Sequence, residues 1–374
     1  MSARRIERAE RRVEQWVRPE IRRLSAYHVP PAEGMIKLDA MENPYGWPPE
    51  MAAAWLQVIR RTALNRYPDP HAKALKKRLR ANMRLPDAAG LVLGNGSDEL
   101  IQMLALLVGG PGRILLTPEP GFAMYRLIAE VTGTGYRGVD LNAEDFSLDL
   151  DTWLSAIEEV QPAVIFVAHP NNPTGNLFSE QALRATVEHA PGLVVVDEAY
   201  APFASHSMLR WLGRYENLLV MRTLSKMGLA GLRLGLLAGP APWLRELEKV
   251  RLPYNVNTLT QVSADFALDR SAVLDDQAAR IRAERARLFE AINDNARLHA
   301  FPSEANFVLF RTPPGWGGGV FSALLDAGIL IKNVGGAHPL LADCLRVTVG
   351  TPEENDAFIK ALTGAIARES RAGT

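Results

Sequence analysis

Short runs of apolar and β-branched residues recur along the first two thirds of the chain. Each run is bounded by polar or turn-forming positions, and most are separated by segments long enough to hold a helix. Continuous apolar runs of this length are typical of strands buried on both faces of a parallel sheet. The pattern predicts an α/β fold with a mostly parallel sheet, whose strands lie at Arg113–Thr117, Val164–Ala168, Leu193–Asp197, Leu218–Met221 and Leu234–Ala238.

The pattern changes from about Asn257 to Asn295, where the mixture of charged and apolar positions is typical of long helices. The glycine-rich stretch Gly315–Gly319, around Trp316, is predicted to be a loop. Further apolar runs in this part of the chain predict a second, smaller domain that is closed by a helix. Its expected elements are strands at Asn306–Phe310, Ile329–Lys332 and Leu345–Val349, and a helix at Pro352–Arg368.

Composition and charge exclude some classes of partner. The chain has 374 residues, of which 47% are apolar, so it is long and apolar enough for two domains that share an extensive core. Lys and Arg together number 42, and so do Asp and Glu. No basic excess draws the chain to nucleic acid or to anionic lipid, so neither is expected as a partner.

The N-terminal segment and the cysteine content predict a cytoplasmic location. Residues 1–23 are rich in arginine and glutamate and lack the apolar region of a secretory signal. No stretch of the sequence approaches the ~18 consecutive apolar residues of a membrane span. The single cysteine, Cys344, cannot form an intramolecular disulfide. Its place before an apolar run favours a packed thiol over a nucleophile.

Three polar motifs follow predicted strands, at the edge where the ligands of parallel sheets gather. Asn172 begins an Asn-Pro-Thr-Gly turn, Asp197 ends a strand, and Lys226 lies in an Arg-Thr-Leu-Ser-Lys string. A lysine among hydroxyl groups, with Arg233 seven residues later, is an arrangement that holds an aldehyde cofactor as a Schiff base and binds its phosphate. The alternative for Lys226 is an exposed lysine in a loop.

The residues around these motifs also have two interpretations. A carboxylate at the end of a buried strand is costly without a cationic partner, which Asp197 would find in a cofactor. The alternative is a structural cap. Asn172 and Tyr200 can bind a cofactor oxygen, or they can serve as a turn former and a core residue.

A glycine-rich turn, Gly94 to Gly96, opens into an apolar stretch that predicts a buried helix. Because helix N-termini favour anions, Ser97 and Asp98 are candidate phosphate ligands through their main-chain amides. Ordinary capping is the alternative. Phe122, after the strand that ends at Thr117, can lie on the face of a cofactor ring, although aromatic residues at such helix starts are most often packing residues.

Longer strings add a resemblance. The most specific are Leu38–Gly46, Asn65–Pro70 and Leu345–Thr351, beside the three motifs above. From about Tyr27 to Thr351 the chain resembles the fold-type I, class I/II aminotransferases that depend on pyridoxal 5'-phosphate, and among them the histidinol-phosphate aminotransferases.

The resemblance implies an overall architecture. The fold would be a large domain with a mostly parallel seven-stranded sheet sandwiched by helices, and a smaller α+β domain. It implies an N-terminal arm at residues 1–45 that packs on the small domain and the partner subunit, a large cofactor-binding domain at residues 46–268 and a small C-terminal domain at residues 269–374.

The resemblance also implies roles, residue by residue. Lys226 becomes the lysine that holds the cofactor and shuttles the proton, Asp197 the partner of the pyridine nitrogen, and Asn172 and Tyr200 the partners of the phenolic oxygen. Phe122 takes the ring-stacking position. The phosphate would be bound by Ser97, Asp98, Thr223, Ser225 and Arg233, and by Tyr67 reaching across from the partner subunit. That contact implies a homodimer with shared active sites.

On the substrate side, Arg346 matches the arginine that relatives turn towards the substrate. Lys332 stands where many relatives have another arginine, and it offers a point charge in place of a bidentate fork. Tyr27, in the N-terminal arm, and Asn43 complete the substrate-binding residues that the resemblance implies.

The implied reaction is transamination of L-histidinol phosphate with 2-oxoglutarate, giving imidazole acetol phosphate and L-glutamate in histidine biosynthesis. It would run as a ping-pong reaction through pyridoxamine phosphate. Two relatives share the cofactor motifs: aromatic amino acid aminotransferases and a threonine-phosphate decarboxylase, which is a lyase. A non-catalytic regulator is a third class, and the chain carries no appended DNA-binding segment that would favour it.

Overall fold

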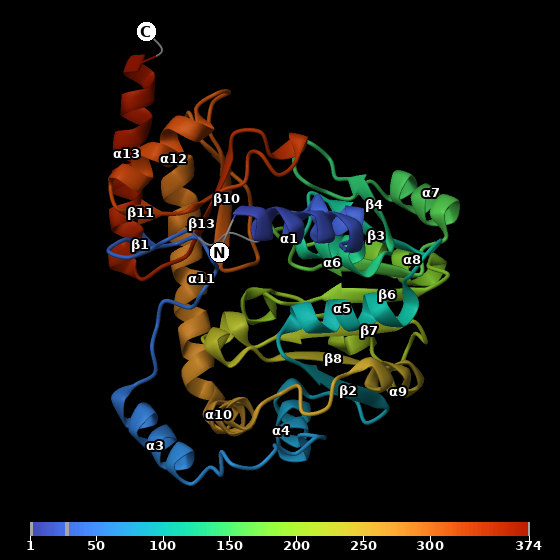
Figure 1. The fold of residues 1–374 in the computed structure, drawn as a ribbon. Helices are drawn as coiled ribbons and strands as arrows, with labels where there is room; N and C mark the ends of the chain where they lie inside the picture. Colours follow the sequence, from blue (N-terminus) through green and yellow to red (C-terminus); the bar gives the residue numbers. More distant parts are fainter. Residues whose placement is uncertain (1–2, 27–29, 373–374) are drawn as a thin grey trace.

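A seven-stranded sheet forms the centre of the larger part of the molecule (Figure 1). The computed structural model describes residues 3–26 and 30–372. The strand order is β2-β8-β7-β6-β5-β3-β4. In chain order the strands are β2 (Ala89–Gly94), β3 (Ile114–Glu119), β4 (Gly135–Asp140), β5 (Val164–Ala168), β6 (Leu193–Asp197), β7 (Leu218–Thr223) and β8 (Gly235–Pro240).

Strand direction follows from the length of the connections. Each of the pairs β3–β4, β3–β5, β5–β6 and β6–β7 is parallel, and a helix crosses over between consecutive strands from β3 to β6. Only short 3₁₀ turns, η3 (Ser225–Met227) and η4 (Ala230–Leu232), connect β7 to β8. A connection this short returns the chain beside the strand it left, so β8 runs antiparallel to β7 and to β2. The predicted mostly parallel sheet is confirmed.

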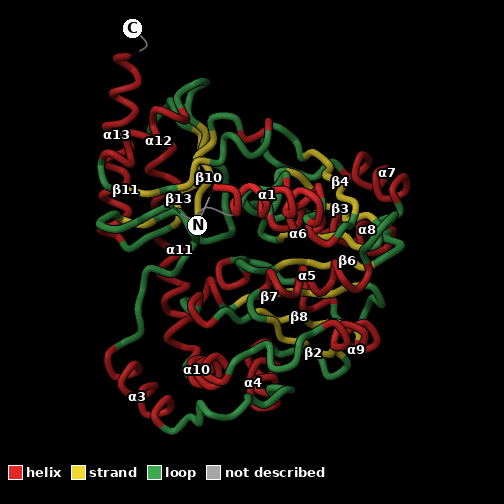
Figure 2. Tube along the Cα trace, viewed as in Figure 1, coloured by secondary structure: helices red, strands yellow, loops and turns green. Residues whose placement is uncertain are grey.

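Helices cover both faces of this sheet, as Figure 2 shows by the helices on either side of the strands. The core on one face joins Leu193 and Val195 of β6 to helices α5 (Ser97–Val108), α6 (Met124–Thr132) and α9 (Ala241–Val250). The core on the other face joins Val194 and Val196 to another set of helices. These include α4 (Lys73–Met83), α7 (Leu150–Val160), α8 (Glu180–His189) and α10 (Thr258–Leu268). Because alternate residues of β6 enter the two cores, its positions 193–196 must all be apolar.

The C-terminal part has its own sheet and core. Its antiparallel sheet has the order β12-β13-β10-β9 and packs against α11, α12 and α13. The elements are α11 (Ser271–Asn293), β9 (His299–Ala300), β10 (Phe307–Arg311), α12 (Gly317–Asp326), β11 (Ile329–Leu330), β12 (Lys332–Asn333), η5 (Pro339–Leu341), β13 (Cys344–Thr348) and α13 (Pro352–Ala372). The three predicted strand regions and the closing helix of this part are confirmed.

The N-terminal segment contacts both parts. The helix α1 (Ala3–Trp16) has exposed side chains from residue 4 to residue 16, and α2 (Pro19–Arg22) lies against α6. The strand β1 (Ile36–Lys37) pairs with β11, and α3 (Pro49–Arg60) then leads to α4. Two further 3₁₀ turns, η1 (Ala201–Phe203) and η2 (Met208–Trp211), follow β6. In the part of the chain that the structure describes, no helix combines the length and the apolar character needed to cross a membrane.

Two details differ from the sequence pattern. Strands β2 and β4 carry glycines and were not among the apolar runs, so the pattern alone misses them. The predicted loop at Gly315–Gly319 is wrong in its second half, because α12 begins at Gly317. The amide of Gly317 donates to Asp343 Oδ1 at 3.1 Å, and a Cβ at this position would lie 3.0 Å from the Asp343 Cα. Tertiary contacts therefore start this helix despite the poor helix propensity of glycine.

Candidate active site

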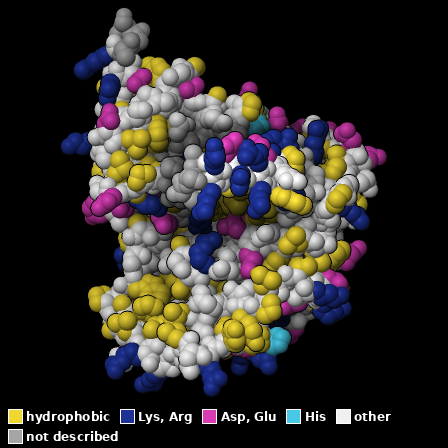
Figure 3. Space-filling model, viewed as in Figure 1, with side chains coloured by type: hydrophobic (Ala, Val, Ile, Leu, Met, Phe, Trp, Pro, Cys, Tyr) yellow, Lys and Arg dark blue, Asp and Glu magenta, His cyan; other side chains and the backbone are white. Residues whose placement is uncertain are grey.

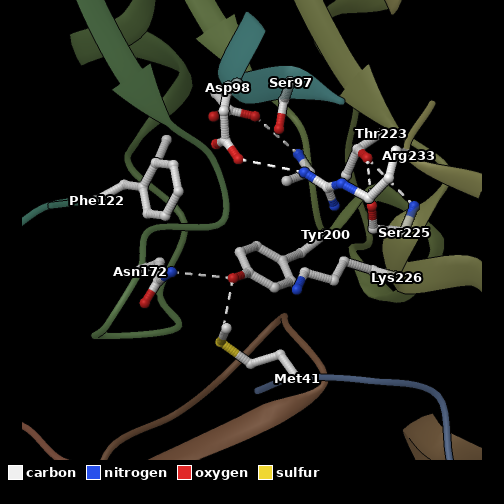
Figure 4. Close-up of a pocket in the computed structure, with 13 residues that line it drawn as sticks. Met41, Ser97, Asp98, Phe122, Asn172, Tyr200, Thr223, Ser225, Lys226 and Arg233 are labelled. Carbon is white, nitrogen blue, oxygen red and sulfur yellow. Dashed lines mark hydrogen bonds and ion pairs between the residues drawn. The ribbon is translucent and has the colours of Figure 1, made fainter. Parts of the chain in front are cut away.

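A cavity opens where the carboxyl ends of β5, β6 and β7 meet the N-terminus of α5 (Figure 4). Parallel strands end together at this edge, so motifs far apart in sequence come within reach of one another. Ten of the side chains predicted from the sequence line the cavity. The complete lining is Met41, Ser97, Asp98, Phe122, Ala168, Asn172, Asp197, Ala199, Tyr200, Thr223, Ser225, Lys226 and Arg233.

Lys226 lies in η3, on the connection that returns from β7 to β8. Its Nζ donates a hydrogen bond to the main-chain oxygen of Ala40 at 3.2 Å and lies 5.9 Å from the centre of the Tyr200 ring. Burial, assisted by the positive charge of Arg346, lowers the pKa of Lys226 from 10.5 to about 8. More of this amine is therefore neutral near pH 7 than in an exposed lysine, and only the neutral amine attacks a carbonyl carbon.

Asp197 is the last residue of β6 and is 3% exposed. Its Oδ2 accepts from the Tyr125 hydroxyl at 2.8 Å and its Oδ1 from the Ala199 amide at 3.1 Å. Burial raises the pKa of Asp197 to about 7, while these two hydrogen bonds act in the opposite direction. Among the described residues no cation pairs with this carboxylate. A cation that enters the cavity would satisfy it.

A chain of hydrogen bonds crosses the cavity from β13 to Tyr200. Arg346 Nη1 donates to Asn172 Oδ1 at 2.6 Å, and Asn172 Nδ2 donates to the Tyr200 hydroxyl at 3.0 Å. The Tyr200 hydroxyl lies 3.3 Å from Met41 Sδ, and Arg346 Nη2 also donates to the main-chain oxygen of Asp39 at 3.0 Å. Burial raises the pKa of Tyr200, so this phenol keeps its proton at neutral pH. The buried Arg346 is thereby tied to two walls of the cavity.

The opposite end of the cavity gathers groups that suit an anion. Gly96, with φ of 88°, precedes the first turn of α5, whose amides have no partner within the helix. Arg233 forms an ion pair with Asp98 at 3.4 Å, and Thr223 donates to Ser225 Oγ at 2.9 Å. A Cβ on Gly96 would lie 2.7 Å from Arg233 Nη2, so glycine lets the guanidinium approach the helix start. In Figure 4 these groups cluster at one end, with Lys226 between them and Met41.

The remaining predicted residues lie outside the cavity lining. Asn43 donates to Gln277 Oε1 at 2.9 Å and accepts from the Tyr45 amide at 2.9 Å, so it fixes the chain near Lys226 without facing the cavity. Lys332 lies on β12 directly opposite Arg346. Two directly opposed residues of an antiparallel pair point to the same side of the sheet, so both cations share one face.

Tyr67 does not line the cavity of its own chain. It is 80% exposed and stacks on Tyr254, with ring centres 4.4 Å apart. Tyr27 lies outside the described residues.

The structure adds two residues that sequence reasoning missed. Tyr125 binds Asp197 from 72 positions away, and no local pattern indicates this contact. Met41 lines the cavity with its backbone in the left-handed region, at φ of 54°. Its amide donates to Thr348 Oγ1 at 3.0 Å and its oxygen accepts from Asn306 Nδ2 at 2.9 Å. Met41 belongs to the Leu38–Gly46 string, which is the signal that could have marked it.

Comparison with known proteins gives a consistent result for sequence and structure. Residues 33–362 match the family model for aminotransferase class I and II. Histidinol-phosphate aminotransferase 2 of Nitrosococcus oceani is 58% identical over 94% of this chain and 97% of that protein. Histidinol-phosphate aminotransferase of Chromobacterium violaceum is 53% identical over 94% of this chain and 98% of that protein.

A solved structure shares the whole architecture. Histidinol-phosphate aminotransferase from Sinorhizobium meliloti, in complex with pyridoxal-5'-phosphate, superposes with a TM-score of 0.83 at 25% identity. The match covers 94% of this chain and 98% of the other. With a family model that spans most of its length, relatives above half identity and this fold, the chain belongs to the class I and II aminotransferases.

Proposed function

We propose that the protein transfers the amino group of L-histidinol phosphate to 2-oxoglutarate, giving imidazole acetol phosphate and L-glutamate in histidine biosynthesis. The observation that carries the proposal is the 58% identity with a protein of that name over 94% of the chain. The cavity supplies the chemistry that such a reaction needs, since it places an amine of lowered pKa, a buried carboxylate and an anion niche around one space.

Pyridoxal 5'-phosphate fits the residues that are present. The Asp197 carboxylate, which has neutral donors only, suits a protonated pyridine nitrogen. The start of α5, Thr223, Ser225 and Arg233 suit a phosphate, because amides, hydroxyls and a guanidinium are its usual donors. Lys226 would hold the aldehyde carbon, Asn172 and Tyr200 the phenolic oxygen, and Phe122 one face of the ring.

Each residue of the cavity has a separate role in the proposed reaction. When bound, the cofactor supplies a ring that withdraws electrons from the α-carbon of the donor. Lys226 Nζ would take the proton from that carbon and deliver it to the aldehyde carbon of the cofactor, and its lowered pKa would let it accept and release a proton near neutral pH. Asp197 keeps a positive charge at the far side of the ring, and Asn172 and Tyr200 hold the phenolic oxygen in place. Arg346 binds the anionic end of the donor.

The charge of the proposed donor accounts for a second cation, Lys332, beside Arg346. A phosphate monoester carries close to two negative charges near neutral pH, so one arginine is not enough. Lys332 and Arg346 share one face of the small sheet and supply two charges together. A free carboxylate donor, such as an aromatic amino acid, needs only one of them.

The test is an assay with a panel of amino donors. Purified enzyme is given histidinol phosphate, phenylalanine, tyrosine or threonine phosphate with 2-oxoglutarate, and L-glutamate is measured. Histidinol phosphate should give the highest kcat/KM, and the Lys226→Ala variant should give none. A preference for phenylalanine or tyrosine would replace the proposal with an aromatic aminotransferase. Release of carbon dioxide from threonine phosphate without glutamate formation would replace it with a lyase.

We also propose that the active unit is a homodimer and that Tyr67 serves the site of the partner subunit. Tyr67 is exposed and does not line the cavity of its own chain. Other large apolar side chains are exposed in the same part of the chain and beside Tyr254: Leu56, Leu64, Leu252 and Leu259. Figure 3 shows apolar side chains gathered over α3 and α10. Exposed apolar patches of this kind mark association surfaces.

Hybrid dimers test the shared site. Mixing a Tyr67→Phe variant with a Lys226→Ala variant should produce dimers that have one site free of both changes, so activity should rise above that of the Tyr67→Phe protein alone. No gain on mixing, with hybrid formation verified by mass spectrometry, would place Tyr67 in the site of its own chain.

We propose the cytoplasm as the compartment of this protein, where the single cysteine, Cys344, would remain reduced.

A further inference from the structure

We propose that Tyr125 is a positioning residue that fixes the Asp197 carboxylate in its ionised form against the ring nitrogen of the cofactor, and that the same side chain braces Phe122. The inference rests on the proposed use of pyridoxal phosphate but not on the identity of the amino donor. It gives a role to a residue that contacts neither cofactor nor substrate.

The backbone after β3 brings Tyr125 and Phe122 together. The Tyr125 amide donates to the Phe122 main-chain oxygen at 3.1 Å, which turns the chain so that the two rings meet edge to face, with centres 5.4 Å apart and planes at 87°. Phe122 lines the cavity, whereas Tyr125 lies behind it and is fully buried. A displacement of the Tyr125 ring would therefore move the aromatic wall of the cavity.

Another side of the Tyr125 ring is also covered. Phe166 of β5 stacks on it, with ring centres 4.9 Å apart and planes at 21°. With Phe166 against one part of the ring and Phe122 against another, the hydroxyl has one position, 2.8 Å from Asp197 Oδ2. Each partner of this buried hydrogen bond would be left unsatisfied without the other, which costs more free energy than the bond itself contributes.

The electrostatics of the two groups determine which one donates and which protonation state of Asp197 is favoured. Burial raises the pKa of Asp197 to about 7, and the hydrogen bond from Tyr125 is the largest effect that opposes it. Burial and the neighbouring Asp197 charge raise the pKa of Tyr125 well above 10, so the phenol remains the donor. A hydroxyl that only donates favours the ionised carboxylate. Tyr125 thus opposes transfer of the ring-nitrogen proton to Asp197.

The experiment uses the Tyr125→Phe variant, which keeps the ring and removes the hydroxyl. Wild-type and variant proteins are loaded with pyridoxal 5'-phosphate labelled with 15N in the ring, and the 15N chemical shift is recorded against pH. The wild type should show a protonated nitrogen, and Tyr125→Phe should move towards the unprotonated value. The affinity of the cofactor-free variant for pyridoxal phosphate should fall, and kcat should fall about 10-fold with KM nearly unchanged.

Tyr136→Phe is the matched control. The Tyr136 hydroxyl also donates to a carboxylate, Glu119 Oε1 at 2.7 Å, but neither residue lines the cavity. This variant should match the wild type in 15N shift and cofactor affinity. An unchanged 15N shift in Tyr125→Phe, or an equal change in both variants, would overturn the proposal.

Two further measurements keep the outcome decisive. In an Asp197→Asn background, Tyr125→Phe should cause little additional change, whereas a purely structural role predicts the same loss in both backgrounds. If Tyr125→Phe does not fold, 3-fluorotyrosine at position 125 keeps the ring and donates more strongly, so the pH at which the ring nitrogen loses its proton should rise, and a fall would contradict the proposal. Failure of the wild type to bind pyridoxal phosphate would instead sink the proposed function.

Discussion

The two sides of the cavity are built in different ways. On the side formed by β5, β6 and β7, each polar group is held by a second group of the chain: Asp197 by Tyr125, Asn172 by Arg346, and Thr223 by Ser225. On the side formed by β12 and β13, Lys332 is half-buried, and its side chain makes no hydrogen bond or ion pair within the described residues. Arg346 belongs to both sides, since it binds Asn172 and faces Lys332 across the strand pair.

The two sides of the cavity suit two different tasks, which are to act on every donor and to recognise one particular donor. Groups that act on every donor must be held at one angle before the substrate arrives, because a displacement costs rate for all of them. A group that recognises one feature of one donor, as proposed for Lys332, can remain solvated until that donor binds. We therefore expect changes on the first side to affect all donors equally, and changes at Lys332 to depend on the donor.

The largest expected effect is that of Lys226→Ala. Turnover should fall by at least about 10⁴-fold with every donor, because no other lysine among the described residues lines the cavity to hold the cofactor and move the proton. Pyridoxal phosphate should still bind, since the start of α5 and Arg233 remain. Steady-state assays and calorimetric titration measure the two properties separately. Activity comparable to that of the exposed control variant Lys360→Ala would refute the assignment.

Asp197→Asn should follow, with a loss of about 10³-fold in kcat for all donors. A neutral amide cannot keep the ring nitrogen protonated, and each ~1.4 kcal/mol of lost transition-state stabilisation costs a factor of ten. The control is Asp149→Asn: this exposed carboxylate caps α7 by accepting from the Thr152 amide at 2.9 Å, and asparagine caps equally well. Near-normal turnover in Asp197→Asn would show that the residue is only a structural cap.

The sharpest test of the comparison is the pair Arg346→Ala and Lys332→Ala. Each should lower kcat/KM for histidinol phosphate by ~10-fold or more, the loss of a charge-assisted contact worth ~1.5–3 kcal/mol. With phosphate-free histidinol, Lys332→Ala should have little effect, whereas Arg346→Ala should still lower kcat because it releases Asn172. Equal losses of kcat/KM for both donors in the Lys332 variant would mean that Lys332 does not distinguish the phosphorylated donor from the phosphate-free one.

The smallest expected effect concerns the stability of the cofactor-free protein. The pKa of Lys226 is about 8 in the folded chain against 10.5 for a free side chain, so between these values the unfolded chain binds more protons and stability rises with pH. Below pH 8 the buried ammonium destabilises the fold. Lys226→Met should therefore raise Tm at pH 7, by about 2 °C, and the gain should shrink as the pH rises from 8 to 10.5.

Thermal denaturation at pH 7 and pH 9.5 measures this change. The exposed Lys360→Met variant is the control and should shift Tm little at either pH. A gain for Lys226→Met that is the same at both pH values would show that packing, and not the charge of Lys226, is responsible.

The sequence by itself determined the centre of the sheet and the edge that carries the site. Strands β5, β6 and β7 are buried on both faces, so each begins with an uninterrupted apolar run that stands out along the chain. The polar residues that end such runs, Asp197 and the segment before Lys226, are equally visible, because burial leaves few other polar positions nearby. The resemblance of longer strings then implied roles for those residues.

Only the tertiary structure decided the rest, because it depends on contacts between distant positions. The edge strand β4 is partly exposed and follows no continuous apolar pattern, and α12 begins at a glycine because Asp343 accepts from its amide. The hydrogen bond between Tyr125 and Asp197 needs α6, which follows β3, to reach the end of β6 across the intervening strand β5, which sheet order sets and local sequence does not. Packing over long separations chooses such partners, so the residue that positions the carboxylate could not be read from the sequence alone.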